Sequence, residues 1–232
     1  MSSYCLVVNG DSYFSPFEHL GLKFTDDQST IYDRPDKIGL VVFTGGADVS
    51  PSLYGHNNLK SYTNPLRDME EVNIFNAAAE NEIPMAGICR GAQFLCAMAG
   101  GHLVQDITNH TSSHRLSYKD KDGNIMDSPE PVTSTHHQMQ YPWVMEDGSF
   151  DILAWSSRPR SLNYIYDGDG AIDKMEIEPD VVFYNDINAL AIQYHPEYMS
   201  RNSWGFNFAK ALVSEKLGHL VDNRKSLMVG KR

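Results

Sequence analysis

The sequence predicts an α/β fold in which a mostly parallel sheet is flanked by helices. Two apolar runs, 38–43 (IGLVVF) and 189–194 (ALAIQY), have the composition of strands that are buried on both faces. Between them, strand-like and helical segments alternate, which is typical of βαβ units. From about 109 to 186, turn signals such as Asp122-Gly123 interrupt the pattern, so we expect extra short strands and long loops there.

The individual elements follow from local patterns. A first strand is expected at 4–8, and loops with one short helix over 9–37, so the opening βαβ unit is short. Apolar residues at helical spacing predict a helix over 68–81, with Pro65 before it and Pro84 after it. The other expected elements are a strand at 83–88, a helix at 91–99, the strand at 189–194 and a closing helix at 204–217.

The chain has 232 residues, which we divide into a single domain over 1–221 and a C-terminal tail over 222–232. Its 19 basic and 30 acidic residues give a net charge of −11, which disfavours nucleic acid and anionic membranes as partners. No apolar run reaches the roughly 20 residues that span a membrane, and the first residues lack the pattern of a signal peptide. Three cysteines are too few and odd in number for a disulfide framework, so we expect a cytoplasmic protein.

The strongest chemical signal is Gly87-Ile88-Cys89-Arg90-Gly91, between a predicted strand and a predicted helix. It has the form G-x-C-x-G, the thiol counterpart of the nucleophile elbow. A tight turn of this kind leaves no room for side chains two positions either side of the nucleophile. The following helix directs free N–H groups at the sulfur, which favours the thiolate. Cys89 is therefore the predicted nucleophile, and the alternative is a buried structural cysteine, as we expect of Cys96.

The predicted base is His195, which ends a buried strand as Cys89 does. In parallel sheets, active sites form beyond the carboxyl ends of the strands. Glu197, two residues later, can orient the imidazole, and we expect the rate to depend on a group that titrates near neutral pH. The run 44–46 (TGG) ends a third strand, and its backbone N–H groups can contribute to an oxyanion hole. The alternatives are a surface histidine and a simple turn.

Taken together, 87–93 (GICRGAQ) and 194–197 (YHPE) resemble the class I glutamine amidotransferase superfamily. The closest resemblance is to its γ-glutamyl-γ-aminobutyrate hydrolase-like branch, the peptidase C26 group, and the matching motifs span roughly residues 38–217. Thr44 and Thr133 depart from the branch, which usually has Pro and Asn there. Four further blocks carry the resemblance: 45–55 (GGADVSPSLYG), 67–71 (RDMEE), 100–107 (GGHLVQDI) and 132–138 (VTSTHHQ).

This resemblance implies a flavodoxin-like fold and a triad of Cys89, His195 and Glu197. The triad would hydrolyse a γ-glutamyl amide through a glutamyl thioester and release glutamate with ammonia or an amine. The resemblance also implies oxyanion donors at the backbone N–H groups of Gly46 and Arg90. It implies that the glutamyl group is contacted by Gln93, Ser134, His136 and His137.

Other motifs have weaker interpretations. His110 and His114 have the spacing of zinc ligands and lie near His136 and His137, but no Cys or Glu accompanies them at a matching spacing, so we expect no metal. The segment 120–131 begins like a calcium loop but lacks its glycine and its last carboxylate, which predicts a hairpin turn. The sequence has no P-loop, and we expect no cofactor.

Three functions are therefore open. The first is a stand-alone hydrolase of a γ-glutamyl amide, either glutamine or a γ-glutamyl amine. The second is a glutaminase subunit that delivers ammonia to a separate synthetase. The third is a catalytically silent binding protein on the same fold. The complete set of catalytic motifs argues against the third function, and a chain of single-domain length with no fused synthetase favours the first over the second.

Overall fold

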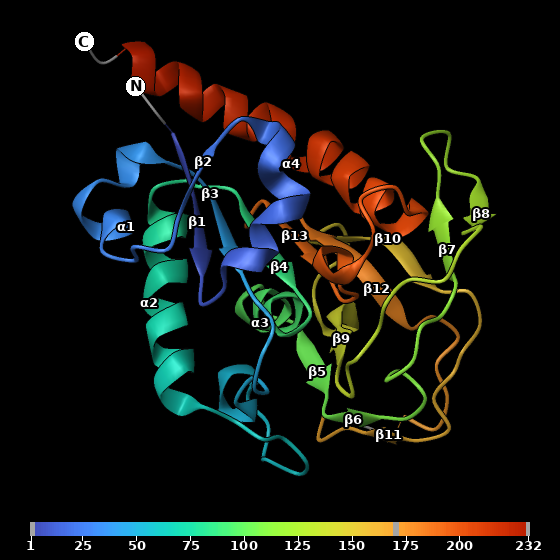
Figure 1. The fold of residues 1–232 in the computed structure, drawn as a ribbon. Coiled ribbons are helices and arrows are strands. Elements are labelled where there is room, and N and C mark those ends of the chain that lie inside the picture. Colours follow the sequence, from blue (N-terminus) through green and yellow to red (C-terminus); the bar gives the residue numbers. More distant parts are fainter. Residues whose placement is uncertain (1–2, 169–171, 231–232) are drawn as a thin grey trace.

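A nine-stranded sheet organises the residues that the computed structural model describes, 3–168 and 172–230. Its order is β2-β1-β3-β4-β13-β12-β10-β7-β8, and helices lie on both faces (Figure 1). Its strands are β1 (Tyr4–Val8), β2 (Lys23–Thr25), β3 (Ile38–Phe43), β4 (Met85–Ile88), β7 (Leu116–Lys119), β8 (Ile125–Asp127), β10 (Phe150–Ser156), β12 (Pro179–Tyr184) and β13 (Ala189–Ile192).

Five neighbouring strands, from β2 to β13 in the sheet order, run parallel to one another. Every residue of β3, β4 and β13 is buried, as expected for apolar strands that are covered on both faces. The predicted strands at 4–8 and 38–43 are confirmed, while β4 and β13 are shorter than predicted. The edge strand β2 was not predicted, because its three residues, Lys23 to Thr25, are largely exposed and too few to form an apolar run.

The other half of the sheet is antiparallel: β12, β10, β7 and β8 each oppose the preceding strand. Only β12 and β7 therefore run against the direction of the parallel half. The predicted short strands between 109 and 186 are confirmed, and β7 and β8 form the predicted hairpin around Gly123. Two small sheets lie beside the main one. They pair β5 (His102–Val104) with β9 (Met139–Tyr141), and β6 (Asp106–Ile107) with β11 (Tyr164–Ile165).

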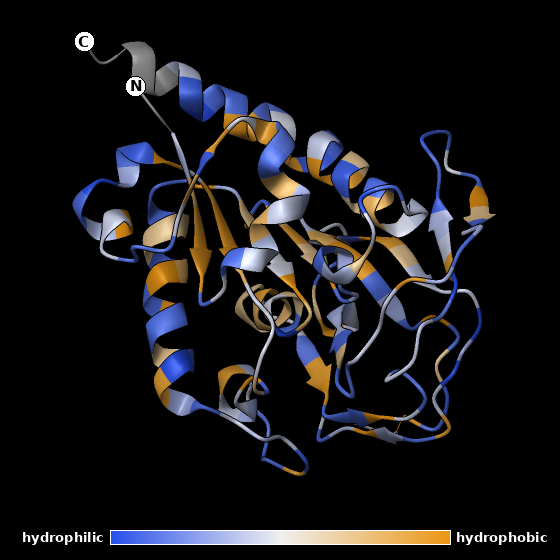
Figure 2. Cartoon of the chain, viewed as in Figure 1, coloured by the Kyte–Doolittle hydropathy of each residue, from blue (hydrophilic) through white to orange (hydrophobic). Residues whose placement is uncertain are grey.

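Two apolar cores cover the two faces of the sheet. Alternate residues of β1 contribute to different cores. Leu6 and Val8 pack with α2 (Pro65–Glu80) and α3 (Arg90–Met98). Cys5 and Val7 pack with the 3₁₀ segment η1 (Asp11–Leu20) and α4 (Trp204–Gly230). Figure 2 shows these strands as predominantly hydrophobic, whereas α2 and α4 alternate between hydrophobic and polar residues. The remaining short helical segments are α1 (Thr30–Asp33), η2 (Pro35–Lys37), η3 (Pro51–Tyr54), η4 (Pro142–Val144) and η5 (Pro196–Tyr198).

The last helix corrects the sequence analysis. We predicted a helix ending at 217 and a tail from 222, but α4 continues to Gly230, and 231–232 lie outside the described residues. A polar residue of this segment, Arg224, attaches the helix to the rest of the fold. The Arg224 guanidinium donates to the backbone carbonyls of Ile38, Asn81 and Pro35 at 2.9, 2.5 and 3.0 Å. Within the described part of the chain, no helix is both long and apolar enough to cross a membrane.

Candidate active site

Cys89 occupies a sharp turn between β4 and α3. Its backbone has φ 55° and ψ −111°, a conformation that side-chain-bearing residues rarely adopt. The Cys89 N–H donates to the carbonyl of Ile192 at 2.8 Å, which ties the turn to β13. A Cβ atom added at Gly87 would lie 2.3 Å from the carbonyl oxygen of Gly91. One added at Gly91 would lie 2.1 Å from the carbonyl oxygen of Phe43. The two glycines are therefore required by backbone contacts.

We expect Gly91→Ala to destabilise the fold by about 3 kcal/mol or more, because the new methyl group collides with the backbone of a buried strand. Thermal unfolding of the purified variant measures this loss. Gly218→Ala is the matched control, since nothing lies within 4 Å of its added carbon on α4. That helical substitution should raise stability by up to about 1 kcal/mol. A Gly91→Ala protein as stable as the wild type would contradict the rigid elbow.

His195 lies three residues beyond Ile192, the last paired residue of β13, and both of its ring nitrogens have partners. Nδ1 lies 2.6 Å from Oε1 of the buried Glu197, and Nε2 lies 2.8 Å from Oγ1 of Thr135. The Tyr198 ring stacks on the imidazole with centroids 4.8 Å apart. Burial alone lowers the pKa of His195, but hydrogen bonding to Cys89 and Glu197 and their charges outweigh it and raise the pKa to about 10. The titration that we expected near neutral pH is therefore displaced upward.

The loop after β3 is fixed by hydrogen bonds from the side chain of Arg67. Its guanidinium donates to the carbonyls of Gly45 and Thr44 at 3.0 and 3.1 Å. Because the carbonyl of Gly45 and the N–H of Gly46 lie on opposite sides of one planar peptide, this anchor directs the Gly46 N–H away from Arg67. The other predicted oxyanion donor, the Arg90 N–H, opens α3 and has no preceding helical turn to bond.

The Arg90 side chain is buried behind the elbow and pairs with Asp68 and Glu71 of α2. Glu71 also accepts from Nε of Arg67 at 2.8 Å, and Asp68 accepts from the Ser50 N–H at 3.1 Å. Two positive and two negative side chains thus form a buried network that joins the elbow to the loop after β3. The block 67–71 is one of the motifs that carry the family resemblance, but no role was predicted for it. The four-residue spacing of Arg67 and Glu71 was the available signal.

A family model described as Peptidase C26 matches residues 19–197, more than half of the chain. The chain belongs to the peptidase C26 family. The predicted resemblance is therefore confirmed. Among its relatives, the YvdE protein of Lactococcus lactis, named for its likeness to glutamine amidotransferases, is 28% identical over 80% of this chain and 79% of its own length. The γ-glutamyl-γ-aminobutyrate hydrolase PuuD of Escherichia coli is 29% identical over 72% of this chain and 66% of its own.

Solved structures agree on the fold of this C26 protein. A glutamine amidotransferase from Thermotoga maritima has a TM-score of 0.54 at 14% identity, covering 99% of this chain and 94% of its own. The glutaminase domain of CTPS from Trypanosoma brucei has a TM-score of 0.53 at 14% identity, covering 91% and 94%. At these identities the likeness concerns the fold alone. It confirms the predicted α/β class and the flavodoxin-like arrangement.

Three of the four predicted substrate contacts in this C26 protein are buried and have partners inside the protein. The Gln93 amide donates to the Gln138 carbonyl at 3.1 Å, and Nδ1 of His136 lies 2.8 Å from that same oxygen. Ser134 donates to the carbonyl of His110 at 2.5 Å. Burial, reinforced by the charge of His110, lowers the pKa of His136 to about 3, which keeps its imidazole neutral. In this structure these side chains hold the 132–138 segment in place.

His137 is the fourth predicted contact and is 38% exposed at its side chain. Its Nε2 lies 3.1 Å from Oδ1 of Asp48, and its Nδ1 lies 3.3 Å from Oδ1 of Asp106. The hydrogen bond with Asp48 contributes most to raising the pKa of His137, burial opposes it, and Asp106 adds to the rise. The raised pKa favours the charged form of an imidazole that lies between two carboxylates and is partly open to solvent.

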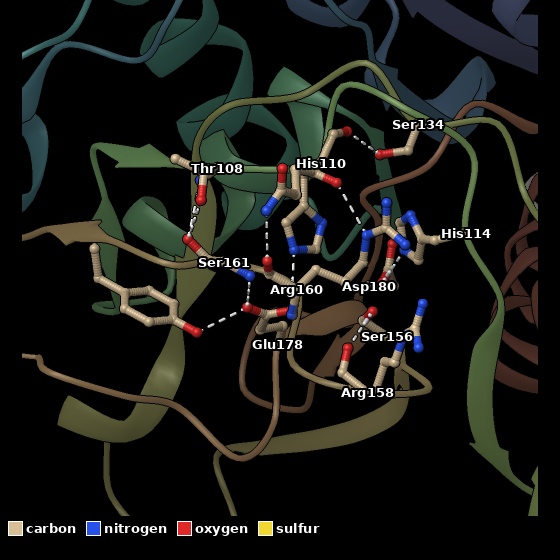
Figure 3. A network of polar contacts seen from close by, with 12 residues as sticks. Thr108, His110, His114, Ser134, Ser156, Arg158, Arg160, Ser161, Glu178 and Asp180 are labelled. Atoms are coloured by element: carbon tan, nitrogen blue, oxygen red, sulfur yellow. Dashed lines mark hydrogen bonds and ion pairs between the residues drawn. The ribbon is translucent and has the colours of Figure 1, made fainter.

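The histidines that suggested zinc belong to a buried polar network (Figure 3). Nε2 of His110 lies 3.0 Å from Oε2 of Glu178, and Nε2 of His114 lies 2.9 Å from Oδ2 of Asp180. Each imidazole thus faces its own carboxylate, from Glu178 just before β12 and from Asp180 within it. Over the described ranges, no group of three or more His, Cys, Asp or Glu has an arrangement that could hold a metal ion. The network joins the loop before β7 to the antiparallel half of the sheet.

Proposed function

We propose that this C26 protein hydrolyses a γ-glutamyl amide, glutamine or a γ-glutamyl amine, with Cys89 as nucleophile. The observation that carries the proposal is the strained elbow, which presents Cys89 beside an imidazole that Glu197 holds at Nδ1. The name of the relative PuuD, a γ-glutamyl-γ-aminobutyrate hydrolase, supports the substrate class. The enzyme family supports catalysis over a silent binding role.

In the acylation step, the Cys89 sulfur attacks the γ-carbonyl carbon, and the carbonyl π electrons move to the oxygen. The N–H groups of Gly46 and Arg90 stabilise this oxyanion. The Nε2 proton of His195 then passes to the amide nitrogen, the C–N bond breaks, and ammonia or the amine leaves. Glu197 keeps the proton on Nδ1, so that Nε2 is the nitrogen that exchanges protons.

In the deacylation step, the neutral Nε2 of His195 accepts a proton from water as the water oxygen attacks the thioester carbon. The C–S bond breaks, glutamate leaves, and the Cys89 thiolate again faces an imidazolium. Over the whole cycle, the protein gives one proton to the leaving group and takes one from water, so it returns to its starting protonation state.

The activity is expected to fall as the pH rises through about 10, because His195 loses the proton that the leaving group needs. Glu197→Gln removes the charge that stabilises the imidazolium, so its alkaline limb should move to lower pH by about one unit or more. Rates measured between pH 6 and 11 test this. Glu80→Gln, at an exposed site on α2, is the control and should leave the limb in place. Identical limbs in all three proteins would contradict the role of Glu197.

A glutaminase subunit of a two-component amidotransferase is the second candidate, because the fold matches the glutaminase domain of CTPS. In this case the partner would be a separate synthetase. In either case we place the protein in the cytoplasm, and its charge of −11 argues against nucleic acid or an anionic membrane as partners.

The deciding experiment is glutamate release by the pure protein from glutamine and from a panel of γ-glutamyl amines, with Cys89→Ala as control. Rapid, Cys89-dependent release from one γ-glutamyl amine would support the hydrolase and identify its substrate. Slow release from glutamine alone would support the glutaminase subunit. No release and no covalent glutamyl adduct on Cys89 would contradict both and leave the silent binding protein.

A further inference from the structure

The Nε2 atom of His195 has a partner that the proposed mechanism does not use. Oγ1 of Thr135 lies 2.8 Å from it, at a sequence separation of 60 residues. The same ring also has a hydrogen-bonding contact with Cys89. Since Nδ1 is hydrogen-bonded to Glu197, the Nε2 proton is shared between two hydrogen-bond acceptors, the Cys89 sulfur and the Thr135 hydroxyl.

The position of Thr135 is determined by the backbone on which it lies. The His195 N–H donates to the carbonyl of Thr133 at 3.0 Å, so the segment that carries Thr135 is attached directly to the backbone of His195. The buried Ser134 hydroxyl attaches the same segment to the carbonyl of His110. Thr135 is exposed, whereas His195 is only 4% exposed. The hydroxyl therefore lies between the Nε2 edge of a buried ring and the solvent.

We propose that Thr135 is a positioning residue that holds the Nε2 proton of His195 on the solvent side of the site. This inference rests on the proposed function. A hydroxyl accepts a hydrogen bond from an imidazolium and donates one to a neutral imidazole, so Thr135 serves both protonation states without losing its own proton. Between turnovers, Thr135 keeps the imidazole of His195 in the rotamer in which Nε2 can exchange a proton with substrate or water.

Of the titratable groups around the ring, Glu197 and Cys89 favour its protonated form. Glu197 and Cys89 form hydrogen bonds with the ring, and Tyr198 stacks on one of its faces. The Tyr13 hydroxyl lies near Gly45 of the loop after β3, as does Cε1 of His195. None of these four side chains carries a positive charge. Removing the Thr135 hydroxyl leaves them in place, so the imidazolium persists near neutral pH, and the expected change is a limited shift.

Thr135→Val removes the hydroxyl with little change of shape, and Thr135→Ser keeps it. With a γ-glutamyl substrate, we expect kcat to fall on the order of tenfold in Thr135→Val, with KM nearly unchanged, because one hydrogen bond to a charged group is lost. Thr135→Ser should stay within about threefold of the wild type. Thr133→Val is the matched control, since the hydrogen bond between Thr133 and His195 is made by the backbone carbonyl, which the substitution keeps.

A second measurement does not depend on turnover. An NMR titration of the His195 Cε1 proton, assigned by its absence in His195→Asn, should show a midpoint lowered by about half a unit to one unit in Thr135→Val only. If the wild type releases no glutamate but this shift is seen, the hydrogen bond stands and the proposed function fails. A midpoint unchanged in Thr135→Val, or an equal loss of kcat in Thr133→Val, would overturn the inference.

Discussion

Replacement of Cys89 by serine is expected to lower kcat for γ-glutamyl amide hydrolysis by a factor on the order of 10³ to 10⁶, with the fold retained. Serine fits the elbow because it is close to cysteine in size, and the strained backbone at φ 55° is held by Gly87, Gly91 and the bond to Ile192. The hydroxyl does not ionise beside His195 as a thiol can, so the attacking anion is lost.

Glutamate release and intact-protein mass spectrometry measure this effect, since the wild type should carry a glutamyl adduct that Cys89→Ser lacks. Cys96→Ala is the control. The Cys96 sulfur lies 3.3 Å from the carbonyl of His102 in the core, and burial raises its pKa to about 12, so it remains an inert thiol. This variant should lose some stability but keep its kcat. Full turnover by Cys89→Ser would refute the thioester mechanism.

The second large effect concerns stability. Glu71→Gln is expected to lower the free energy of unfolding by about 3 to 5 kcal/mol, because it leaves the guanidinium of Arg90 buried without one of its two carboxylates. Arg67 also loses its ion pair with Glu71, which weakens its hydrogen bonds to the carbonyls of Gly45 and Thr44. The predicted oxyanion donor at Gly46 then becomes mobile, so kcat should fall as well.

Urea unfolding of Glu71→Gln beside Glu70→Gln measures this prediction. Glu70 is the neighbouring residue on α2 but is exposed, so its change should cost less than about 0.5 kcal/mol. A loss below about 1 kcal/mol for Glu71→Gln would show that the buried network does not support the elbow.

Much of the fold could be predicted because its central strands are buried on both faces. The runs at 4–8 and 38–43 become β1 and β3 with the predicted bounds. Prediction was wrong where long-range contacts decide the structure. The three-residue β2 is an exposed edge strand that exists only by pairing with β1. The end of α4 is polar by sequence, yet Arg224 attaches it to backbone carbonyls of three distant segments.

By itself, the sequence determined the family and the places of Cys89 and His195 beyond the ends of buried strands, with Glu197 two residues after His195. These features are local, since a strand, a tight turn and a helix start are each encoded within a few residues. Only the tertiary structure decided what surrounds them. It turns Gln93, Ser134 and His136 inward, closes the ion pairs of Arg90, and brings Thr135 to His195. Such contacts join segments that are far apart in the chain, so they depend on how the sheet and its loops pack.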